Sequence, residues 1–148
     1  MVENISSGQN FKAIDIGSLD QLNEHEFVHP KFGTVDKSRI FIGELLETSG
    51  AEISFRDLSP NTVIPFLHKH HKNEEIYIFL KGEGKFQVDD NVFSVKEGTV
   101  VKVMPDGNRT LSNNSNEHMI YMVVQAKINS ISGYNISDGY REEGEIKL

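Results

Sequence analysis

Residues 68–82 read HKHHKNEEIYIFLKG, and this stretch decides both the fold and the candidate site. In an extended strand the side chains of residues i and i+2 point to the same face, so His68 and His70 aim two imidazoles at one point. The apolar run after a short turn predicts a second strand, which returns Glu75 beside them. Two imidazoles and a carboxylate suit a divalent first-row metal and leave coordination positions open.

The same stretch resembles the first motif of the cupin family, G-x5-H-x-H-x(3,4)-E-x6-G. His68 and His70 fill the paired histidines, and the interval from Glu75 to Gly82 fits E-x6-G. Thr62 stands where the motif opens with glycine. The resemblance implies that the three side chains are metal ligands, with iron, manganese, nickel or zinc as the candidate metals.

The second cupin motif, G-x5-P-x-G-x2-H-x3-N, is only partly present. Pro105, Gly107 and Asn114 agree with it, and Gly98 lies one place early. Thr110 stands where the family has its usual fourth protein ligand, a histidine. A hydroxyl is a poor ligand for such a metal, so the resemblance implies three protein ligands and weaker retention of the metal.

Short strand-forming stretches with turn signals between them follow one another along most of the chain. The expected strands lie near 41–46, 51–57, 63–70, 75–81, 84–89, 92–96, 99–104, 109–112 and 118–126. This spacing predicts an all-β barrel or sandwich. The resemblance makes it a cupin-type jelly-roll β-barrel, or double-stranded β-helix, with at most one or two short helices.

The length of 148 residues fits a single domain, 1–148. The resemblance covers about 38–126, which we expect to be the barrel core. It leaves an N-terminal extension, 1–37, and a C-terminal tail, 127–148.

The N-terminal extension carries its own signals. Residues 1–10 are polar and are expected to fray, whereas 11–16 has the pattern of an edge strand. A capping box at 18–21 predicts a short helix that continues to about Phe27.

Composition excludes several classes of function. The net charge of −7 and the isoelectric point near 5.3 argue against nucleic acid and anionic membranes as partners. No apolar run approaches the ~20 residues that span a bilayer, and the first residues lack the pattern of a signal peptide. The sequence contains no cysteine, which excludes disulfides and thiolate chemistry. We therefore expect a cytoplasmic protein.

Residues 25–29 match H-E-x-x-H, the zinc-protease pattern. That chemistry needs both histidines on one face of a stable helix. Pro30 follows at once and disfavours helical geometry at His29. The pattern is therefore interpreted as the end of a polar helix with solvated histidines.

Three further side chains are candidates for the lining of a ligand pocket: Tyr77, Gln87 and Thr110. Tyr77 shares a face with Glu75 by the period of two, and its hydroxyl needs a partner when buried. Gln87 depends on strand register, since a shift of one residue moves a side chain to the other face. Among the other histidines, His71 falls off the ligand face, and His118 can replace the missing ligand only at the metal end of the barrel.

Two functions remain open. The first is a non-catalytic cupin that binds a small molecule, with a metal that is structural or absent. The second is a metal-dependent enzyme, a dioxygenase or an isomerase, that acts on a small oxygenated substrate. The resemblance also implies a homodimer, and the apolar residues on both faces of 76–80 agree with a covered surface.

Overall fold

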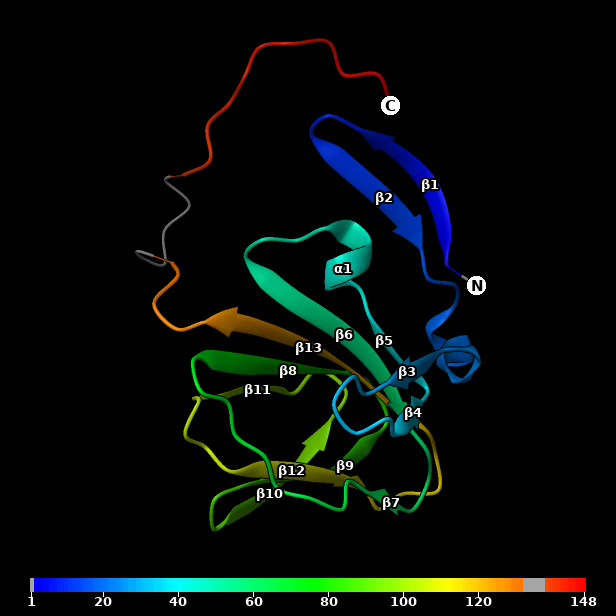
Figure 1. Cartoon of the computed structure of the whole chain (residues 1–148), viewed down its shortest axis with the longest axis vertical. Coiled ribbons are helices and arrows are strands. Elements are labelled where there is room, and N and C mark those ends of the chain that lie inside the picture. Colours follow the sequence, from blue (N-terminus) through cyan, green and yellow to red (C-terminus); the bar gives the residue numbers. More distant parts are fainter. Residues whose placement is uncertain (1, 132–137) are drawn as a thin grey trace.

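Strands dominate the computed structural model, which describes residues 2–131 and 138–148 (Figure 1). The strands are β1 (Glu3–Gly8), β2 (Phe11–Asp15), β3 (Glu26–Val28), β4 (Val35–Lys37), β5 (Arg39–Phe41), β6 (Ala51–Leu58), β7 (Thr62–Val63), β8 (Asn73–Lys81), β9 (Glu83–Val88), β10 (Asn91–Lys96), β11 (Val100–Val103), β12 (Arg109–Asn113) and β13 (Met119–Lys127). Two short helices accompany them: a 3-10 helix, Leu19–Glu24, and α1, Gly43–Leu46. Neither has the length and apolar character that a membrane-crossing helix needs.

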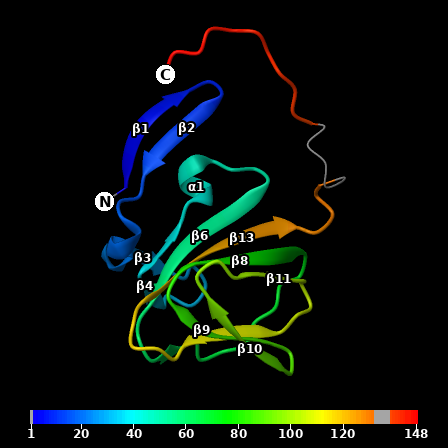
Figure 2. The ribbon, with the colours of Figure 1, turned by 180° about the vertical axis from the view of Figure 1, so that it is seen from behind.

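Two sheets lie face to face as the walls of a barrel (Figures 1 and 2). The first has the order β11-β8-β13-β6-β5, and the second has the order β10-β9-β12-β7. Every pairing within them is antiparallel. The predicted all-β double-stranded β-helix with two short helices is confirmed.

The core between the sheets follows from the alternation of buried and more exposed residues, which is clearest along β8 and β12. In β8 the buried side chains are Glu75, Tyr77 and Phe79, which lie two residues apart. The Tyr77 and Phe86 rings meet edge to face with their centroids 4.8 Å apart. Each such aromatic side chain contributes about 1.5–3 kcal/mol through burial. Polar Glu75 thus lies on the inner wall of an otherwise apolar barrel.

Gly82 explains why the first motif ends in glycine. Its φ is +77°, a conformation that side chains rarely adopt. A Cβ at this position would stand 2.5 Å from the carbonyl oxygen of His118 and 3.0 Å from the Cα of Met119. The turn from β8 to β9 can therefore pass this close to the start of β13 only without a side chain.

A second apolar cluster covers part of the outer face of the five-stranded sheet. Leu22 of the 3-10 helix and Ile40 of β5 are buried against Ile120, with Leu80 packed beside them. Part of the outer face of β8 is therefore covered by the chain itself. This packing supports the single domain, which stays a prediction.

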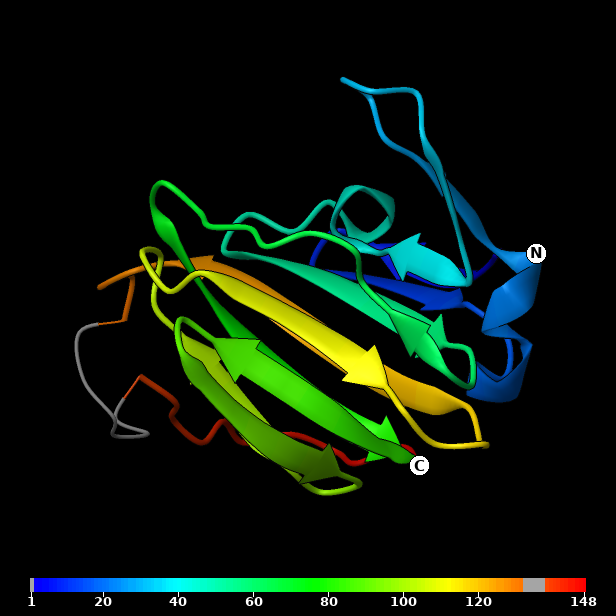
Figure 3. The ribbon, with the colours of Figure 1, turned by 90° about the horizontal axis from the view of Figure 1, so that it is seen from below.

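The N-terminal extension differs from what the sequence predicts. Residues 3–8 do not fray but form β1, which pairs with β2 in a hairpin. The capping box at Ser18 opens a 3-10 helix that ends at Glu24 rather than near Phe27, and the Ser18 hydroxyl accepts from the Asp20 amide. The next residues form β3, which pairs with β4 in a second hairpin that projects from the barrel in Figure 3.

Two expected strands are largely wrong. The stretch 41–46 is mostly α1, because the chain turns there after β5. Of 63–70, only Val63 belongs to a strand, and the rest is irregular apart from a single bridge at His68. Of the predicted tail, 132–137 lies outside the described residues, and 138–148 contains neither helix nor strand.

Candidate metal centre

The two motif histidines lie on an irregular segment, 64–72, that connects β7 to β8. The His68 amide donates to the Arg109 carbonyl and the Arg109 amide donates back to His68, both at 3.1 Å. Two residues on, the His70 amide donates to the Pro105 carbonyl at 3.1 Å. These backbone bonds fix both histidines against the start of β12, although the segment is not a regular strand.

Glu75 meets the two histidines from the inner face of β8. One ligand atom from each of the three residues lies within 4.8 Å of the others. The His70 Nε2 atom is 3.1 Å from Glu75 Oε1, and the His68 Nε2 atom is 3.5 Å from Glu75 Oε2. The sequence prediction that these three side chains converge is thus met, and the group is positioned for a metal ion.

The surroundings of the His70 side chain show whether a metal ion fits at this place. His70 Nε2 is buried and, although it lies 3.1 Å from Glu75 Oε1, it makes no well-directed hydrogen bond among the described residues. A buried imidazole nitrogen without a partner is costly unless another group satisfies it. A metal ion bound by nitrogen and oxygen ligands would do so, so the side chains present fit the group.

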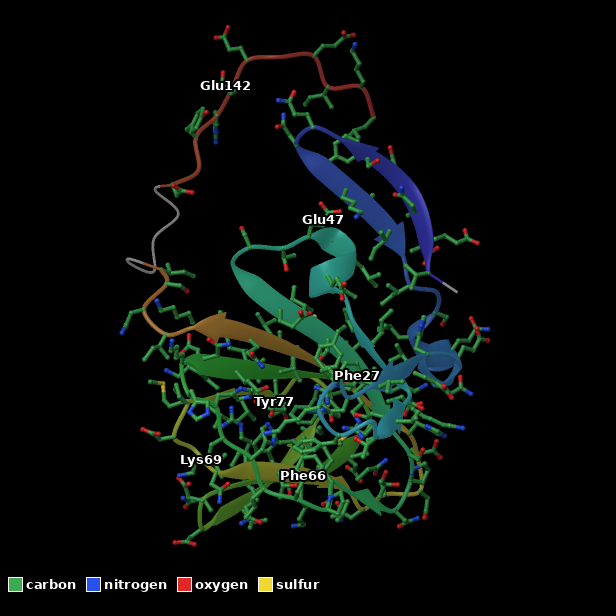
Figure 4. The ribbon with its side chains drawn as sticks, in the orientation of Figure 1. Phe27, Glu47, Phe66, Lys69, Tyr77 and Glu142 are labelled. Carbon is green, nitrogen blue, oxygen red and sulfur yellow. The ribbon has the colours of Figure 1, made fainter. Side chains whose placement is uncertain are left out.

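Two buried donors hold the second oxygen of Glu75. The Tyr77 hydroxyl donates to Oε2 at 2.6 Å, and Arg109 Nε donates to the same oxygen at 3.0 Å. Arg109 Nη2 lies 2.9 Å from it. Glu75 Oε1, by contrast, faces only His70 among these contacts. The carboxylate is therefore oriented through Oε2 and keeps Oε1 for a ligand. Figure 4 shows Tyr77 between the sheets, with Phe66 and Lys69 on the segment that carries the histidines.

Arg109 is itself fixed on all sides and has an exposed fraction of 0%. Its Nη1 atom donates to the Gly107 carbonyl at 2.7 Å and to the Pro105 carbonyl at 3.4 Å. The sequence reasoning missed this residue, because Arg109 does not occupy a named place in the motif.

The surroundings shift the pKa of Glu75, of Tyr77 and of His70. Burial alone would raise the pKa of Glu75, but hydrogen bonds from His68 and Tyr77 oppose it. With the charges of His70 and Arg109 added, the pKa of Glu75 falls well below its usual range. Burial, and then the negative charge of Glu75, raises the pKa of Tyr77 far above its usual value.

His70 shifts in the direction that favours metal binding. Burial is the largest cause that lowers the pKa of His70; the positive charges of Arg109 and His68 add to this, and Glu75 opposes it. The imidazole is therefore more readily neutral, which a metal ligand must be.

The lowered pKa of Glu75 predicts a specific acid sensitivity. The unfolded chain takes up this proton near the ordinary value of 4.5, whereas the folded protein resists it. The stabilisation is thus complete above that pH and declines as the pH falls below it. Below pH 4, with chelator present, we expect wild type to lose about 1.4 kcal/mol per pH unit more than Glu75→Gln. Urea unfolding across pH 3–7 measures both slopes, and parallel slopes would contradict the prediction.

Thr110 and Gln87 do not lie in this group. They are paired neighbours on β12 and β9, and both alternate with buried residues. The Thr110 hydroxyl donates to the Ile64 carbonyl, and the Gln87 amide donates to the Asp89 carbonyl. The expectation that Thr110 takes the place opposite the histidines is therefore wrong, because it faces away from the barrel interior.

The second motif is shifted by one residue from Gly107 onward. Arg109 and Asn113 are buried on the inner face of β12 and lie four positions apart, as the motif's histidine and asparagine do. Asn113 donates to the carbonyls of Leu58 and Glu117. Arg109 thus stands where the sequence comparison expected a ligand, and Asn113 takes the place first given to Asn114. The alternation of Arg109, Leu111 and Asn113 was the available signal.

The remaining histidines lie elsewhere. His118 Nδ1 is 2.8 Å from Asp57 Oδ1, beside the end of β8 that pairs with Ile120. The six residues from Glu75 to Lys81 place it roughly 20 Å along the strand from the candidate site. His118 is thus no substitute ligand.

Residues 25–29, which match H-E-x-x-H, do not form a helix. Glu26–Val28 form β3, so His25 and His29 flank a strand rather than share a helix face. His25 Nε2 contacts the Ile16 carbonyl at 2.9 Å, and His29 Nδ1 accepts from the Lys31 amide. These contacts give the two histidines local structural roles.

The comparisons with known proteins agree with this geometry. The family model described as Cupin domain matches residues 54–125. A cupin protein from Bacteroides fragilis is 32% identical, with a TM-score of 0.68; the match covers 71% of this chain and 89% of that one. A predicted oxalate decarboxylase from Thermotoga maritima is 20% identical, with a TM-score of 0.57 and coverage of 70% and 91%, which shows the fold alone.

An uncharacterized protein of Methanocaldococcus jannaschii is 38% identical over 50 residues. Those residues are 34% of this chain and 40% of that protein. The match thus spans less than half the length of this curated relative.

Proposed function

Because the chain belongs to the cupin family, we propose that it binds a divalent metal ion in its barrel through His68, His70 and Glu75, and a small molecule beside it. The observation that carries the proposal is the convergence of three ligand atoms, with Glu75 Oε1 and His70 Nε2 facing each other at 3.1 Å. A bound metal would act there as a Lewis acid toward an oxygen of the small molecule.

The protein's own residues orient the ligand set. Tyr77 and Arg109 hold Glu75 through Oε2, as outer groups commonly orient metal ligands. The side chains of His68 and His70 are 37% and 23% exposed, so the site opens to solvent on the histidine side. Three protein ligands leave coordination positions open toward that side, where a small oxygenated molecule can enter.

A metal-dependent enzyme, either a dioxygenase or an isomerase, is the second candidate. The same open positions favour it, since they can accept a substrate or dioxygen. Tyr77 is poorly suited as its acid, because its proton is held by Glu75 and its pKa is raised. Catalysis would therefore rest on the metal and on groups of the substrate.

Metal analysis tests the proposal. Freshly purified protein, and protein dialysed against chelator and reloaded, should hold about one iron, manganese, nickel or zinc ion per chain. Protein that contains none of these metals and takes up none in titration would overturn it. Metal-dependent turnover or oxygen consumption with small hydroxy or keto acids would favour the enzyme over the binding protein.

We also propose a homodimer. Ile5 and Phe11 of the β1–β2 hairpin are 66% and 57% exposed, and a two-stranded hairpin alone is only marginally stable in water. A second copy would cover these side chains. Light scattering should give about twice the chain mass of 16.7 kDa, and deletion of residues 1–17 should shift the mass toward the monomer. A full-length monomer contradicts the dimer; an unchanged dimer after deletion moves the interface elsewhere.

A further inference from the structure

We propose that Arg109 supplies the positive charge that neutralises Glu75 when no metal is bound, and that the same charge sets the affinity of the barrel for a metal. In the metal-free protein the guanidinium balances Glu75 and keeps the ligand set assembled. When a metal arrives, the same fixed charge opposes it. This inference rests on the proposed function for the choice of ligands and adds the residue that governs their strength.

The geometry shows a cation built into the ligand set. Arg109 is fully buried, and two of its nitrogens lie within 3.0 Å of Glu75 Oε2. Its backbone pairs with His68, and its Nη1 atom is tied to the carbonyls of Gly107 and Pro105. The guanidinium therefore cannot swing away from the site while the start of β12 stays in place.

The positive charge of Arg109 opposes the binding of a metal ion. A guanidinium remains protonated at any ordinary pH, so Arg109 is a permanent positive charge. A divalent ion bound to Glu75 would share one carboxylate with that charge, in a region where few water molecules screen it. Like charges separated by a few ångströms at a protein interior repel strongly. The site is thus assembled without metal but binds metal less tightly than three ligands alone would.

One polar atom supports this division of roles. Arg109 Nη2 is buried and has no well-directed hydrogen bond among the described residues, although it is 2.9 Å from Glu75 Oε2. The contact of Nη2 with Glu75 is therefore mainly one of charge, beside the hydrogen bond that Nε donates to the same oxygen. An arginine that served only to stiffen β12 would need its carbonyl partners and no carboxylate.

The test compares metal affinity across matched variants. Arg109→Gln removes the charge and keeps a hydrogen-bonding side chain, whereas Arg109→Lys keeps the charge. Arg56→Gln is the control, since Arg56 pairs with Asp36 and not with Glu75. Zinc and manganese are titrated into chelator-treated protein by calorimetry, and thermal unfolding is followed with and without each metal.

We expect Arg109→Gln to bind metal at least about 100-fold more tightly than wild type, Arg109→Lys to gain less than about tenfold, and Arg56→Gln to match wild type. Arg109→Gln should also be less stable than wild type without metal and regain that loss when metal is added. If this variant folds only with metal present, the result supports the proposal.

Two results would overturn the inference: an Arg109→Gln protein that binds no more tightly than wild type, or one that stays unfolded at every metal concentration. The outcome is distinct from that of the proposed function. If the wild-type protein binds no metal but the Arg109→Gln variant does, the proposed function is rejected. The proposed role of Arg109 is then still supported.

Discussion

Glu75→Gln should destabilise the metal-free protein by about 3–5 kcal/mol, although the side chain keeps its size and one acceptor oxygen. The loss arises because Arg109 is then a buried charge without a counter-charge, since Glu75 is the only carboxylate that contacts it among residues 2–131 and 138–148. Urea unfolding at pH 7 in the presence of chelator measures the change. Glu74→Gln, one residue away and without an ion pair to Arg109 in the part of the chain that the structure describes, should change stability by less than about 0.5 kcal/mol.

The double variant Glu75→Gln with Arg109→Met separates charge from packing. Removing both members of a buried ion pair often costs little, because no charge is left unpaired. The double variant should therefore recover most of the stability that the single change removes. Equal losses in the single and double variants would show that Glu75 supports the fold through its shape rather than through its pairing with Arg109.

His70→Ala should weaken metal binding by more than about 100-fold, because it removes a direct ligand and even outer residues change affinity by 10–100-fold. His71→Ala is the matched control: the neighbouring residue is exposed and belongs to no group that can hold a metal among the described residues. Calorimetric titration with zinc measures both. Equal losses of metal affinity from the two changes would mean that His70 does not point toward the metal site as described.

The regular part of the barrel was predictable because its signal is local. Along β8, buried and less buried residues alternate with the period of two, and turn residues mark the ends. The segment 64–72 misled the prediction, because its apolar residues resemble a strand while its backbone makes only scattered bonds to β12. The strand expected at 11–16 is present as β2. Strand β1 was missed because its residues are mostly polar and all exposed, so no buried face shaped its sequence.

The candidate site was predictable in part for the same reason. His68, His70 and Glu75 are close in sequence, and their spacing matches a motif. Arg109 enters from a distant strand, and its place depends on a connection one residue shorter than the motif allows. A single-residue shift moves every side chain of a strand to the other face, so Thr110 was named where Arg109 stands.

The site joins two parts of the barrel that differ in how firmly they are held. Glu75 lies within a strand that is paired on both sides, whereas the histidines lie on a connection held by scattered backbone bonds. Three of these bonds join it to 105–109, and one at each end joins it to Leu111 and to Ile128. Segments with few such bonds open at a lower free energy than the strands around them. Detachment of 64–72 would withdraw two ligands together while the paired strands stay in place. The lifetime of an ion held by these ligands would then depend on how often this short connection opens, and exchange of the ion would not require the barrel to unfold.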